Sequence, residues 1–251
     1  MTTRLVEPYG SGPLQRGEWW IPDGRGPLPT VVLVHGGYWR PVYDRSLEDP
    51  VAADLCDRGY LVWNVDYAAA DAAWPTTLTD VAAAYDHLIT SSRVDANRIA
   101  VVGHSAGGHL ALWLASRHRL PAAAPGAPGP NIPSPTLSVG QAPVAALAEG
   151  ARQGLGGGAV EALMGGTPEQ LPERYTVADP EALLPTGVAT LLIHGTADDT
   201  VPVGQSERYV AAATAAGDRS RLQTYRGGHY EHLDPASEAV GMLRSVLASE
   251  L

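Results

Sequence analysis

Arg98-Ile-Ala-Val-Val-Gly-His-Ser-Ala-Gly-Gly-His-Leu-Ala-Leu-Trp-Leu114 decides the fold of this chain, because it joins two structural patterns through a turn. Residues 98–102 form an apolar run without alternation, which is typical of a strand buried on both faces of a parallel sheet. From Ser105 onward, large apolar residues recur at helical spacing. The stretch therefore predicts a buried strand, a glycine-rich turn and a helix, with a serine at the turn.

Similar apolar runs recur on both sides of this stretch, with helical patterns between them. One helix is expected after Thr77-Leu-Thr-Asp80, which resembles an N-terminal capping arrangement. The final helix is expected to open with Asp234-Pro235 as N-cap and first helical residue. Strands that alternate with helices predict an α/β fold with a mostly parallel central sheet flanked by helices. The other expected strands are residues 31–34, 60–65, 190–193 and 221–225.

The composition limits the possible functions. The chain has 251 residues, 45% of them apolar and 18% charged, and a formal net charge of −10. We interpret residues 1–251 as one globular domain, without an apolar run near the roughly 20 residues of a membrane span. The negative charge argues against nucleic acid or a membrane as partner, since both need clustered positive charge. Cys56 is the single cysteine, which excludes an internal disulfide framework, and without a recognisable secretion signal we expect a cytoplasmic protein.

Polar and glycine residues follow the expected strands at the point where each strand ends. In open α/β sheets, ligands bind at the carboxyl ends of the strands. We therefore expect four segments to lie along one rim of the sheet: His35-Gly-Gly37, Asp66-Tyr67, Gly103-His-Ser105 and His194-Gly-Thr-Ala-Asp198.

The turn Gly103-His-Ser-Ala-Gly107 has the pattern G-x-S-x-G between a strand and a helix, which is the context of a nucleophile elbow. Such a turn strains the backbone of its serine, and side chains in place of the two glycines would clash with the adjoining strand and helix. Ser105 is thereby expected at a helix N-terminus with its hydroxyl raised above the sheet. The alternative is a glycine-serine turn that only links the two elements.

A serine hydroxyl needs a base that is oriented by a carboxylate, and in this architecture the chain order is Ser, then Asp or Glu, then His. Asp198 is the expected acid, with Asp199 as a solvated or capping neighbour. Two histidines lie beyond the acid, and we favour His229 over His232 because it follows two glycines. The alternative for either histidine is a position in a surface loop.

Backbone N–H groups are the expected donors to the oxyanion of a tetrahedral intermediate. Residues 35–39, His-Gly-Gly-Tyr-Trp, follow an early strand, where the HGGG-type segment of lipases and esterases lies. We expect Gly37 and Tyr38 to supply donors from this segment, and Ala106, directly after the serine, to complete the oxyanion hole. The alternative is a Gly-Gly turn that follows a strand.

Together these motifs resemble the α/β-hydrolase superfamily over nearly the whole chain. The HGGYW form is similar to the kynurenine formamidase (arylformamidase) and hormone-sensitive-lipase-like esterase branch. The resemblance implies an α/β-hydrolase fold in which Ser105 is the nucleophile, Asp198 the orienting acid and His229 the base. In such relatives an aromatic and an acidic residue commonly follow the histidine, as Tyr230-Glu231 does here.

Aromatic residues near the expected strand ends indicate a pocket for an acyl or aryl group. Trp39, Tyr67 and Trp74 are the candidate substrate-binding residues, with ordinary core packing as the alternative. A small or minimal cap is expected from an insertion within about residues 126–186, which are rich in proline and glycine.

The predicted function is a cofactor-free serine hydrolase that cleaves small carboxylic esters or aryl formamides, such as N-formylkynurenine, through an acyl-enzyme. No metal is expected, since no H-E-x-x-H pattern occurs. The expected partner is a small-molecule ester or amide, and the oligomeric state stays open. One alternative is an acylaminoacyl or prolyl-oligopeptidase-like peptidase, and another is a non-catalytic, ligand-binding receptor with this fold.

Overall fold

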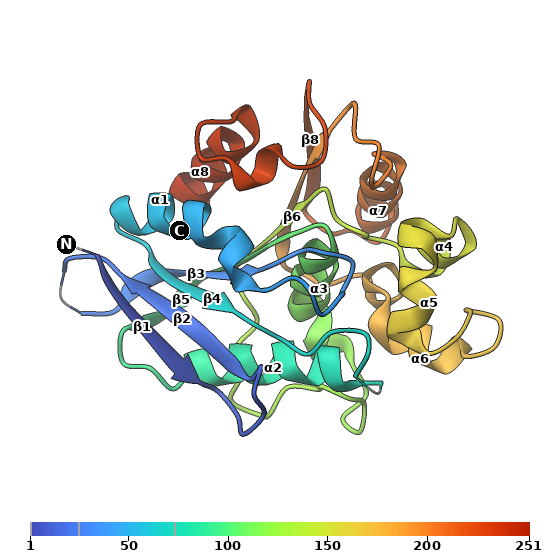
Figure 1. Cartoon of the computed structure of the whole chain (residues 1–251), viewed down its shortest axis with the longest axis horizontal. Coiled ribbons are helices and arrows are strands. Elements are labelled where there is room, and N and C mark those ends of the chain that lie inside the picture. Colours follow the sequence, from blue (N-terminus) through green and yellow to red (C-terminus); the bar gives the residue numbers. More distant parts are fainter. Residues whose placement is uncertain (1, 25, 73) are drawn as a thin grey trace.

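The computed structural model describes residues 2–24, 26–72 and 74–251, which form a sheet of eight strands with helices around it (Figure 1). The strand order is β1-β2-β4-β3-β5-β6-β7-β8. The pairs β1·β2 and β2·β4 are antiparallel and the other neighbours are parallel, which confirms the predicted mostly parallel sheet. The strands are β1 (Thr3–Pro8), β2 (Arg16–Ile21), β3 (Leu28–Val34), β4 (Leu61–Val65), β5 (Val94–His104), β6 (Leu137–Gln141), β7 (Ala189–Gly195) and β8 (Ser220–Tyr225).

The middle of the sheet is buried on both faces. Every residue of β4, β6 and β7 is buried, as are residues 99–104 of β5. This burial explains the unbroken apolar runs in the sequence. The edge strand β1 is largely exposed, and neither β1 nor β2 is marked by such a run.

Helices cover both faces of the sheet (Figure 1). α1 and α8 pack on one face, and α2, α3 and α7 pack on the other. None of the helices in the described ranges is long and apolar enough to span a membrane. These helices are α1 (Asp49–Asp57), α2 (Thr76–Leu88), α3 (Ala106–Ser116), α7 (Gly204–Ala215) and α8 (Glu238–Glu250).

The final helix begins later than the sequence predicts. The pair Asp234-Pro235 is expected to open it, but α8 starts at Glu238. Ser237 is the N-cap, and its Oγ accepts a hydrogen bond from the Val240 N–H at 3.1 Å. The Asp234 carboxylate instead accepts from the Ala236 N–H, inside the preceding loop. The predicted start is therefore wrong, because a serine further along the chain supplies the cap.

The start of α2 also differs from the predicted cap. Pro75 occupies the N-cap position, without a capping side-chain hydrogen bond. Thr77 Oγ1 donates to the Ala68 carbonyl at 2.7 Å, and Asp80 Oδ2 accepts from the Ala68 N–H at 3.0 Å. These side chains therefore bind the loop after β4 and do not cap the helix.

The chain between β6 and β7 holds short helices that lie together at one side of the molecule (Figure 1). With β6, they occupy much of the range 126–186 in which a cap-like insertion is expected. The last of them is tied to α3, because Trp113 Nε1 donates to the Val177 carbonyl at 2.8 Å and His109 Nε2 donates to the Ala178 carbonyl at 2.9 Å. The short helices are α4 (Leu147–Arg152), α5 (Ala159–Met164) and α6 (Pro172–Ala178); the 3-10 turns are η1 (Arg45–Glu48), η2 (Arg117–Arg119), η3 (Leu155–Gly157), η4 (Pro180–Leu183) and η5 (Glu231–Leu233).

Candidate active site

The serine of the G-x-S-x-G turn lies between β5 and α3 in a backbone conformation that few non-glycine residues adopt. Ser105 has φ 57° and ψ −116°. A Cβ on Gly103 would clash with the carbonyl of Gly107, and a Cβ on Gly107 would clash with the carbonyl of Val34 in β3. Strand, turn and helix are thus packed so closely that the two glycines are required. The strained serine matches the geometry of a nucleophile elbow.

Asp198 and His229 come from the loops after β7 and β8 and are in direct contact. His229 Nδ1 lies 2.7 Å from Asp198 Oδ2, and both side chains are almost completely buried. Of the competing residues, Asp199 is exposed, and His232 Nε2 lies 3.2 Å from Tyr225 Oη. The structure therefore pairs His229 with Asp198 and leaves His232 and Asp199 out of this contact.

Four donors of the described chain face the Asp198 carboxylate. Oδ1 accepts from the N–H groups of Thr200 and Val201 at 2.9 and 2.8 Å. Oδ2 faces His229 Nδ1 and, at 3.3 Å, His194 Nε2. Burial by itself would raise the pKa of Asp198, but the hydrogen bonds from His194, His229 and Val201 hold it below its usual value. Asp198 therefore remains ionised.

His194 is a second histidine on the acid, and no sequence pattern gave it this role. It stands in β7 and is fully buried. Its Nε2 lies 2.9 Å from the Val201 carbonyl, and its Nδ1 lies 2.7 Å from Ser206 Oγ. Because a carbonyl oxygen only accepts, the hydrogen-bond pattern assigns a proton to Nε2. That proton points toward Asp198 and the Val201 carbonyl.

His104 supports the loop that carries the base. Its Nε2–H donates to the backbone carbonyl of His229 at 2.8 Å, and the two ring centroids are 4.6 Å apart. Burial, followed by the neighbouring His229, lowers the pKa of His104 to about 3. An uncharged imidazole thus packs against the base.

Within the described residues, no group of three or more His, Cys, Asp or Glu side chains is arranged to hold a metal ion.

The His-Gly-Gly-Tyr-Trp segment follows β3 and passes directly beside the elbow. A Cβ on Gly36 would lie 3.1 Å from Ser105 Cβ. Gly37 has φ 108°, a backbone value that disfavours any side chain, and Gly37 and Tyr38 line the same cavity as Ser105. Ala106 is the first residue of α3, so its N–H has no partner within the helix. The three predicted oxyanion donors therefore lie next to the serine.

Tyr67, one of the predicted substrate-binding residues, contacts His35 at the start of the His-Gly-Gly-Tyr-Trp segment. Its Oη donates to the His35 carbonyl at 2.7 Å, and its ring stacks on the His35 ring with a centroid separation of 4.3 Å. Burial lowers the pKa of His35, whose Nδ1–H donates to the Gly36 carbonyl at 2.8 Å. Tyr67 is itself buried. Its contacts therefore fix the position of the glycine segment.

Ser105 and His229 line one cavity with a volume of about 130 Å³. Within the described chain, no hydrogen bond joins Ser105 Oγ to the His229 ring. Catalytic hydrogen bonds are often long or misaligned before substrate binds, and they tighten in the complex. The cavity is also lined by Gly37, Tyr38, Arg40, Tyr43, Leu47, His104, Thr200, Tyr230 and Leu233.

The aromatic residues predicted to bind substrate do not line this cavity. Trp39 is 1% exposed and packs edge-on against His109, with ring centroids 5.4 Å apart. Trp74 is half-buried and lines two other hollows, and the guanidinium carbon of Arg174 lies 5.5 Å from the centroid of its ring. The placement of Tyr67 and Trp39 fits the alternative of core packing. Substrate binding by the three residues stays a prediction.

The remaining wall of the cavity includes residues that no motif of the sequence analysis marks. Tyr43 and Leu47 lie after the glycine segment, Leu47 within η1, and Leu233 lies in η5. Tyr230 is 65% exposed. Its position directly after His229 is a signal in the sequence that points to this wall, whereas Tyr43 and Leu47 have none.

Comparisons with known proteins agree with the geometry. The family described as BD-FAE matches residues 20–126, and the prolyl oligopeptidase family matches residues 159–241. No curated protein matches the chain. Among solved structures, a truncated form of a carbohydrate esterase from gut microbiota superposes with a TM-score of 0.86 at 18% identity, covering 99% of this chain and 96% of the other. This chain has the α/β-hydrolase fold.

Two further structures share the α/β-hydrolase architecture. Esterase B from Lactobacillus rhamnosis has a TM-score of 0.82 at 20% identity, covering 99% of this chain and 84% of its own. An acetyl ester-xyloside bifunctional hydrolase from Caldicellulosiruptor lactoaceticus has a TM-score of 0.76 at 24% identity, and the superposition covers 95% of this chain and 88% of the other. The two family matches divide the site between them, because one contains Ser105 and the glycine segment and the other contains Asp198 and His229. Together they support a hydrolase.

Proposed function

We propose that this chain is a serine hydrolase that cleaves small carboxylic esters through an acyl-enzyme intermediate. The observation that carries the proposal is the 2.7 Å contact between His229 Nδ1 and Asp198 Oδ2, at a cavity that Ser105 also lines. With Nδ1–H directed at an ionised carboxylate, Nε2 is left to accept a proton. This arrangement provides the serine hydroxyl with a base.

In the acylation step, Ser105 Oγ attacks the carbonyl carbon of the ester and its proton moves to His229 Nε2. The carbonyl double bond becomes a single bond to a negatively charged oxygen. The N–H groups of Gly37, Tyr38 and Ala106 stabilise that oxyanion. When the intermediate collapses, the bond to the alcohol breaks and His229 returns the proton to the departing oxygen. Ser105 then carries the acyl group as an ester.

Deacylation follows the same route with water as the nucleophile. His229 takes a proton from water, and the water oxygen attacks the acyl carbon. The second intermediate releases the carboxylic acid as His229 gives the proton back to Ser105 Oγ. Asp198 stays ionised throughout, because its four donors keep its pKa low, and it stabilises each imidazolium.

The size of the cavity favours a short acyl group. Its volume of about 130 Å³ is below the roughly 300–1,000 Å³ of most ligand pockets, and Leu47 and Leu233 contribute apolar wall. The structural neighbours named as a carbohydrate esterase and an acetyl ester hydrolase support an acetyl-type ester as substrate. An aryl formamide is the second candidate, because its formyl group is smaller still and Tyr43 and Tyr230 offer rings for an aryl group.

Covalent labelling and ester turnover test the chemistry. The folded protein is expected to form one fluorophosphonate adduct, at Ser105, and to hydrolyse p-nitrophenyl acetate. Ser105→Ala is expected to lose the adduct, with kcat lower by about 10⁴–10⁶-fold. Ser116→Ala, which removes a buried hydroxyl at the other end of α3, is the matched control. Full turnover by Ser105→Ala, or an adduct at another residue, would overturn the proposal.

Parallel rates on p-nitrophenyl acetate, N-formylkynurenine and an acylaminoacyl peptide decide between the substrate classes. All three reactions use the same triad, so the ratio of kcat/KM values reports the fit of each substrate to the cavity. We expect the acetate ester to be hydrolysed fastest. Tight binding of any of these compounds without turnover would indicate a ligand-binding protein instead.

A further inference from the structure

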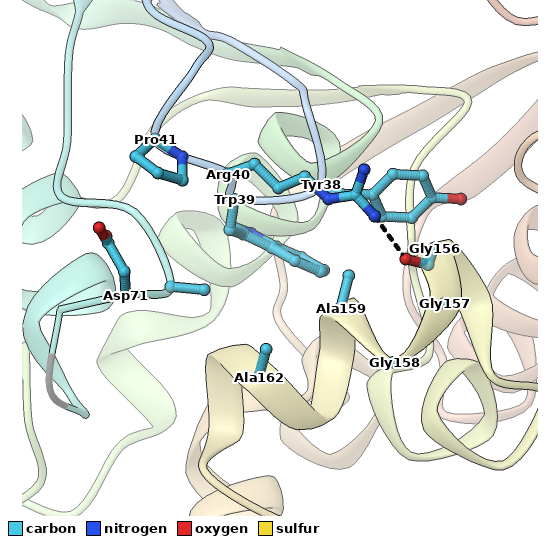
Figure 2. A pocket seen from close by; sticks show the side chains of 11 residues that line it. Tyr38, Trp39, Arg40, Pro41, Asp71, Gly156, Gly157, Gly158, Ala159 and Ala162 are labelled. Carbon is cyan, nitrogen blue, oxygen red and sulfur yellow. Dashed lines mark hydrogen bonds between the residues drawn. The ribbon is translucent and has the colours of Figure 1, made fainter.

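Two hollows meet at one tyrosine beside the elbow. The first is the Ser105 cavity. The second, which we call the alcove, has a volume of about 300 Å³ and lies between the Trp39 segment and residues 156–162 (Figure 2). Tyr38 and Arg40 line both hollows. Tyr38 therefore lies between the alcove and the cavity at Ser105, and we call its ring the partition.

The Tyr38 side chain is held at two places. Its Oη donates to the carbonyl of Thr200 at 2.7 Å, in the loop that carries Asp198. Its ring lies against η3, where a Cβ on Gly156 would come within 2.6 Å of Tyr38 Cδ1. Arg40 Nη2 donates to the Gly156 carbonyl at 2.7 Å, and its guanidinium carbon lies 5.8 Å from the Tyr38 ring centroid (Figure 2). These contacts keep the partition closed.

The backbone of this segment is fixed separately from the ring. Tyr38 has φ 51°, in the left-handed region that non-glycine residues rarely adopt. Hydrogen bonds on both sides keep it there, from the Arg40 N–H to the Gly37 carbonyl at 3.0 Å and from the Ala70 N–H to the Trp39 carbonyl at 2.6 Å. Shortening the Tyr38 side chain therefore opens the partition while these bonds hold the peptide beside Ser105.

The walls of the alcove are small and mostly apolar. Ala70 lines it. Ala159, Ala162 and Trp39 line it as well, and the glycines of the neighbouring turn add no side chains (Figure 2). Its charged groups are Asp71, which is exposed, and Arg40, which already donates to a backbone carbonyl. Such walls suit an unbranched aliphatic chain, because little in them would replace the water around a polar ligand.

We propose that the Tyr38 side chain sets the length of acyl chain that Ser105 accepts, and that the alcove is a second acyl subsite closed off by that ring. The inference rests on the ester hydrolysis proposed above. With the ring in place, a long acyl chain meets the phenol. Without it, the chain continues past Gly156 into the alcove. The two hollows joined fall within the roughly 300–1,000 Å³ of most ligand pockets.

The chain-length profile of Tyr38→Ala tests the partition. The p-nitrophenyl esters of acetate and octanoate share one leaving group, so the ratio of their kcat/KM values reports the acyl subsite. Wild type is expected to prefer acetate. Tyr38→Ala is expected to raise the octanoate-to-acetate ratio by about tenfold or more, the gain from burying two further methylene groups. A uniform loss from a disturbed oxyanion hole cancels in this ratio.

Tyr38→Phe separates the ring from its hydroxyl. The variant keeps the partition and loses only the hydrogen bond to the Thr200 carbonyl. We expect its octanoate-to-acetate ratio to stay within about twofold of wild type. A rise in Tyr38→Phe as large as in Tyr38→Ala would show that the ring itself does not close the alcove.

Ligand binding without turnover keeps the two proposals apart. Calorimetry with octanoate is expected to show about tenfold tighter binding to Ser105→Ala/Tyr38→Ala than to Ser105→Ala, with acetate binding alike. If wild type hydrolyses no ester but octanoate binds tighter to the double variant, the proposed function fails and the subsite stands. If esters are hydrolysed, and neither ratio nor affinity changes in variants that unfold cooperatively on heating, the subsite fails and the function stands.

Discussion

The acid–base side of the Ser105 cavity and the wall opposite are built differently. On the acid–base side, Asp198 faces four donors, and the His229 ring and carbonyl are both hydrogen-bonded. Residues 37–48 carry the opposite wall, and several of their buried polar atoms lack a hydrogen-bond partner within the described chain, namely both carboxylate oxygens of Glu48, Nε1 of Trp39 and Nε of Arg45. Hydrogen bonds hold the first side in one geometry for proton transfer, whereas the second also contains buried groups, such as the Glu48 carboxyl, that no hydrogen bond fixes. Proton transfer and the selectivity for acyl chains are therefore expected to be lost in different variants.

Replacing Asp198 disrupts the acid–base side at its centre and has the largest expected effect. Asp198→Asn presents an amide to His229 Nδ1, which favours the wrong imidazole tautomer, so kcat is expected to fall by about 10⁴-fold. Asp199→Asn is the matched control, because Asp199 is the exposed neighbour, and its kcat should stay within about twofold of wild type. Turnover of p-nitrophenyl acetate measures both. Similar losses in the two variants would show that the 2.7 Å contact is not the catalytic one.

The contrast between the two sides of the cavity also explains which residues of the site could be predicted from the sequence. Gly103 and Gly107 lie where a Cβ has no room, so only glycine fits at these two positions and the requirement is visible in the sequence as a motif. The residue order of this architecture then points to an acid and a base. Tyr43 and Leu47 only fill space in the wall, which side chains of several types could do, so no pattern marks them. His194 acts through Asp198, and a single histidine has no signature for that role.

The fold shows a similar division. Strands buried on both faces, such as β5 and β7, need unbroken apolar runs and are visible in the sequence. The edge strand β1 is largely exposed, so it does not need an unbroken run of apolar residues. The start of α8 could not be placed, because Asp234 and Ser237 are both good N-caps. The choice between them depends on the turn η5, which local pattern does not predict.

Glu48 tests the opposite wall through stability. Burial raises its pKa to about 8, from an ordinary value of 4.5. Between these pH values Glu48 keeps a proton in the folded chain that it has released in the unfolded chain, so its contribution to the free energy of unfolding falls as pH rises, by about 1.4 kcal/mol per pH unit. Glu48→Gln has no such proton. The free energy of unfolding of this variant relative to wild type is therefore expected to rise by about 2 kcal/mol between pH 6 and pH 8.

Urea unfolding of both proteins at pH 6 and pH 8 measures this difference. Glu18→Gln is a suitable control, because Glu18 is also buried but forms an ion pair with Arg4. A Glu48→Gln variant whose stability follows that of wild type at both pH values would mean that Glu48 is ionised in the folded chain. The wall would then hold a hydrogen-bonded carboxylate, and its contrast with the acid–base side would disappear.

His194 is expected to be a positioning residue, with a smaller effect. His194→Met removes the donor to Asp198 Oδ2, so we expect kcat to fall about tenfold with little change in KM. His194→Gln keeps an amide donor and should recover much of the lost kcat. A purely structural role predicts another result, in which both variants unfold at lower temperature and kcat per folded molecule is unchanged.

The smallest expected effect concerns how the ring of Tyr38 is held. Gly156→Ala adds a Cβ 2.6 Å from Tyr38 Cδ1, so we expect the ring to shift away from η3 and to narrow the Ser105 cavity. We expect kcat/KM to fall about threefold more for p-nitrophenyl butyrate than for the acetate, because the longer chain meets the displaced ring.

Gly154→Ala isolates that contact from backbone strain. Gly154 and Gly156 have nearly the same φ, 64° and 63°, but a Cβ on Gly154 meets nothing within 4 Å. Both variants therefore carry a similar backbone penalty, and only the Cβ of Gly156→Ala meets neighbouring atoms, Tyr38 Cδ1 at 2.6 Å and Ala159 Cβ at 2.9 Å. If both lower the butyrate-to-acetate ratio equally, strain in η3 accounts for the loss. If the ratio changes only in Gly156→Ala, the position of the Tyr38 ring governs which acyl chains reach Ser105.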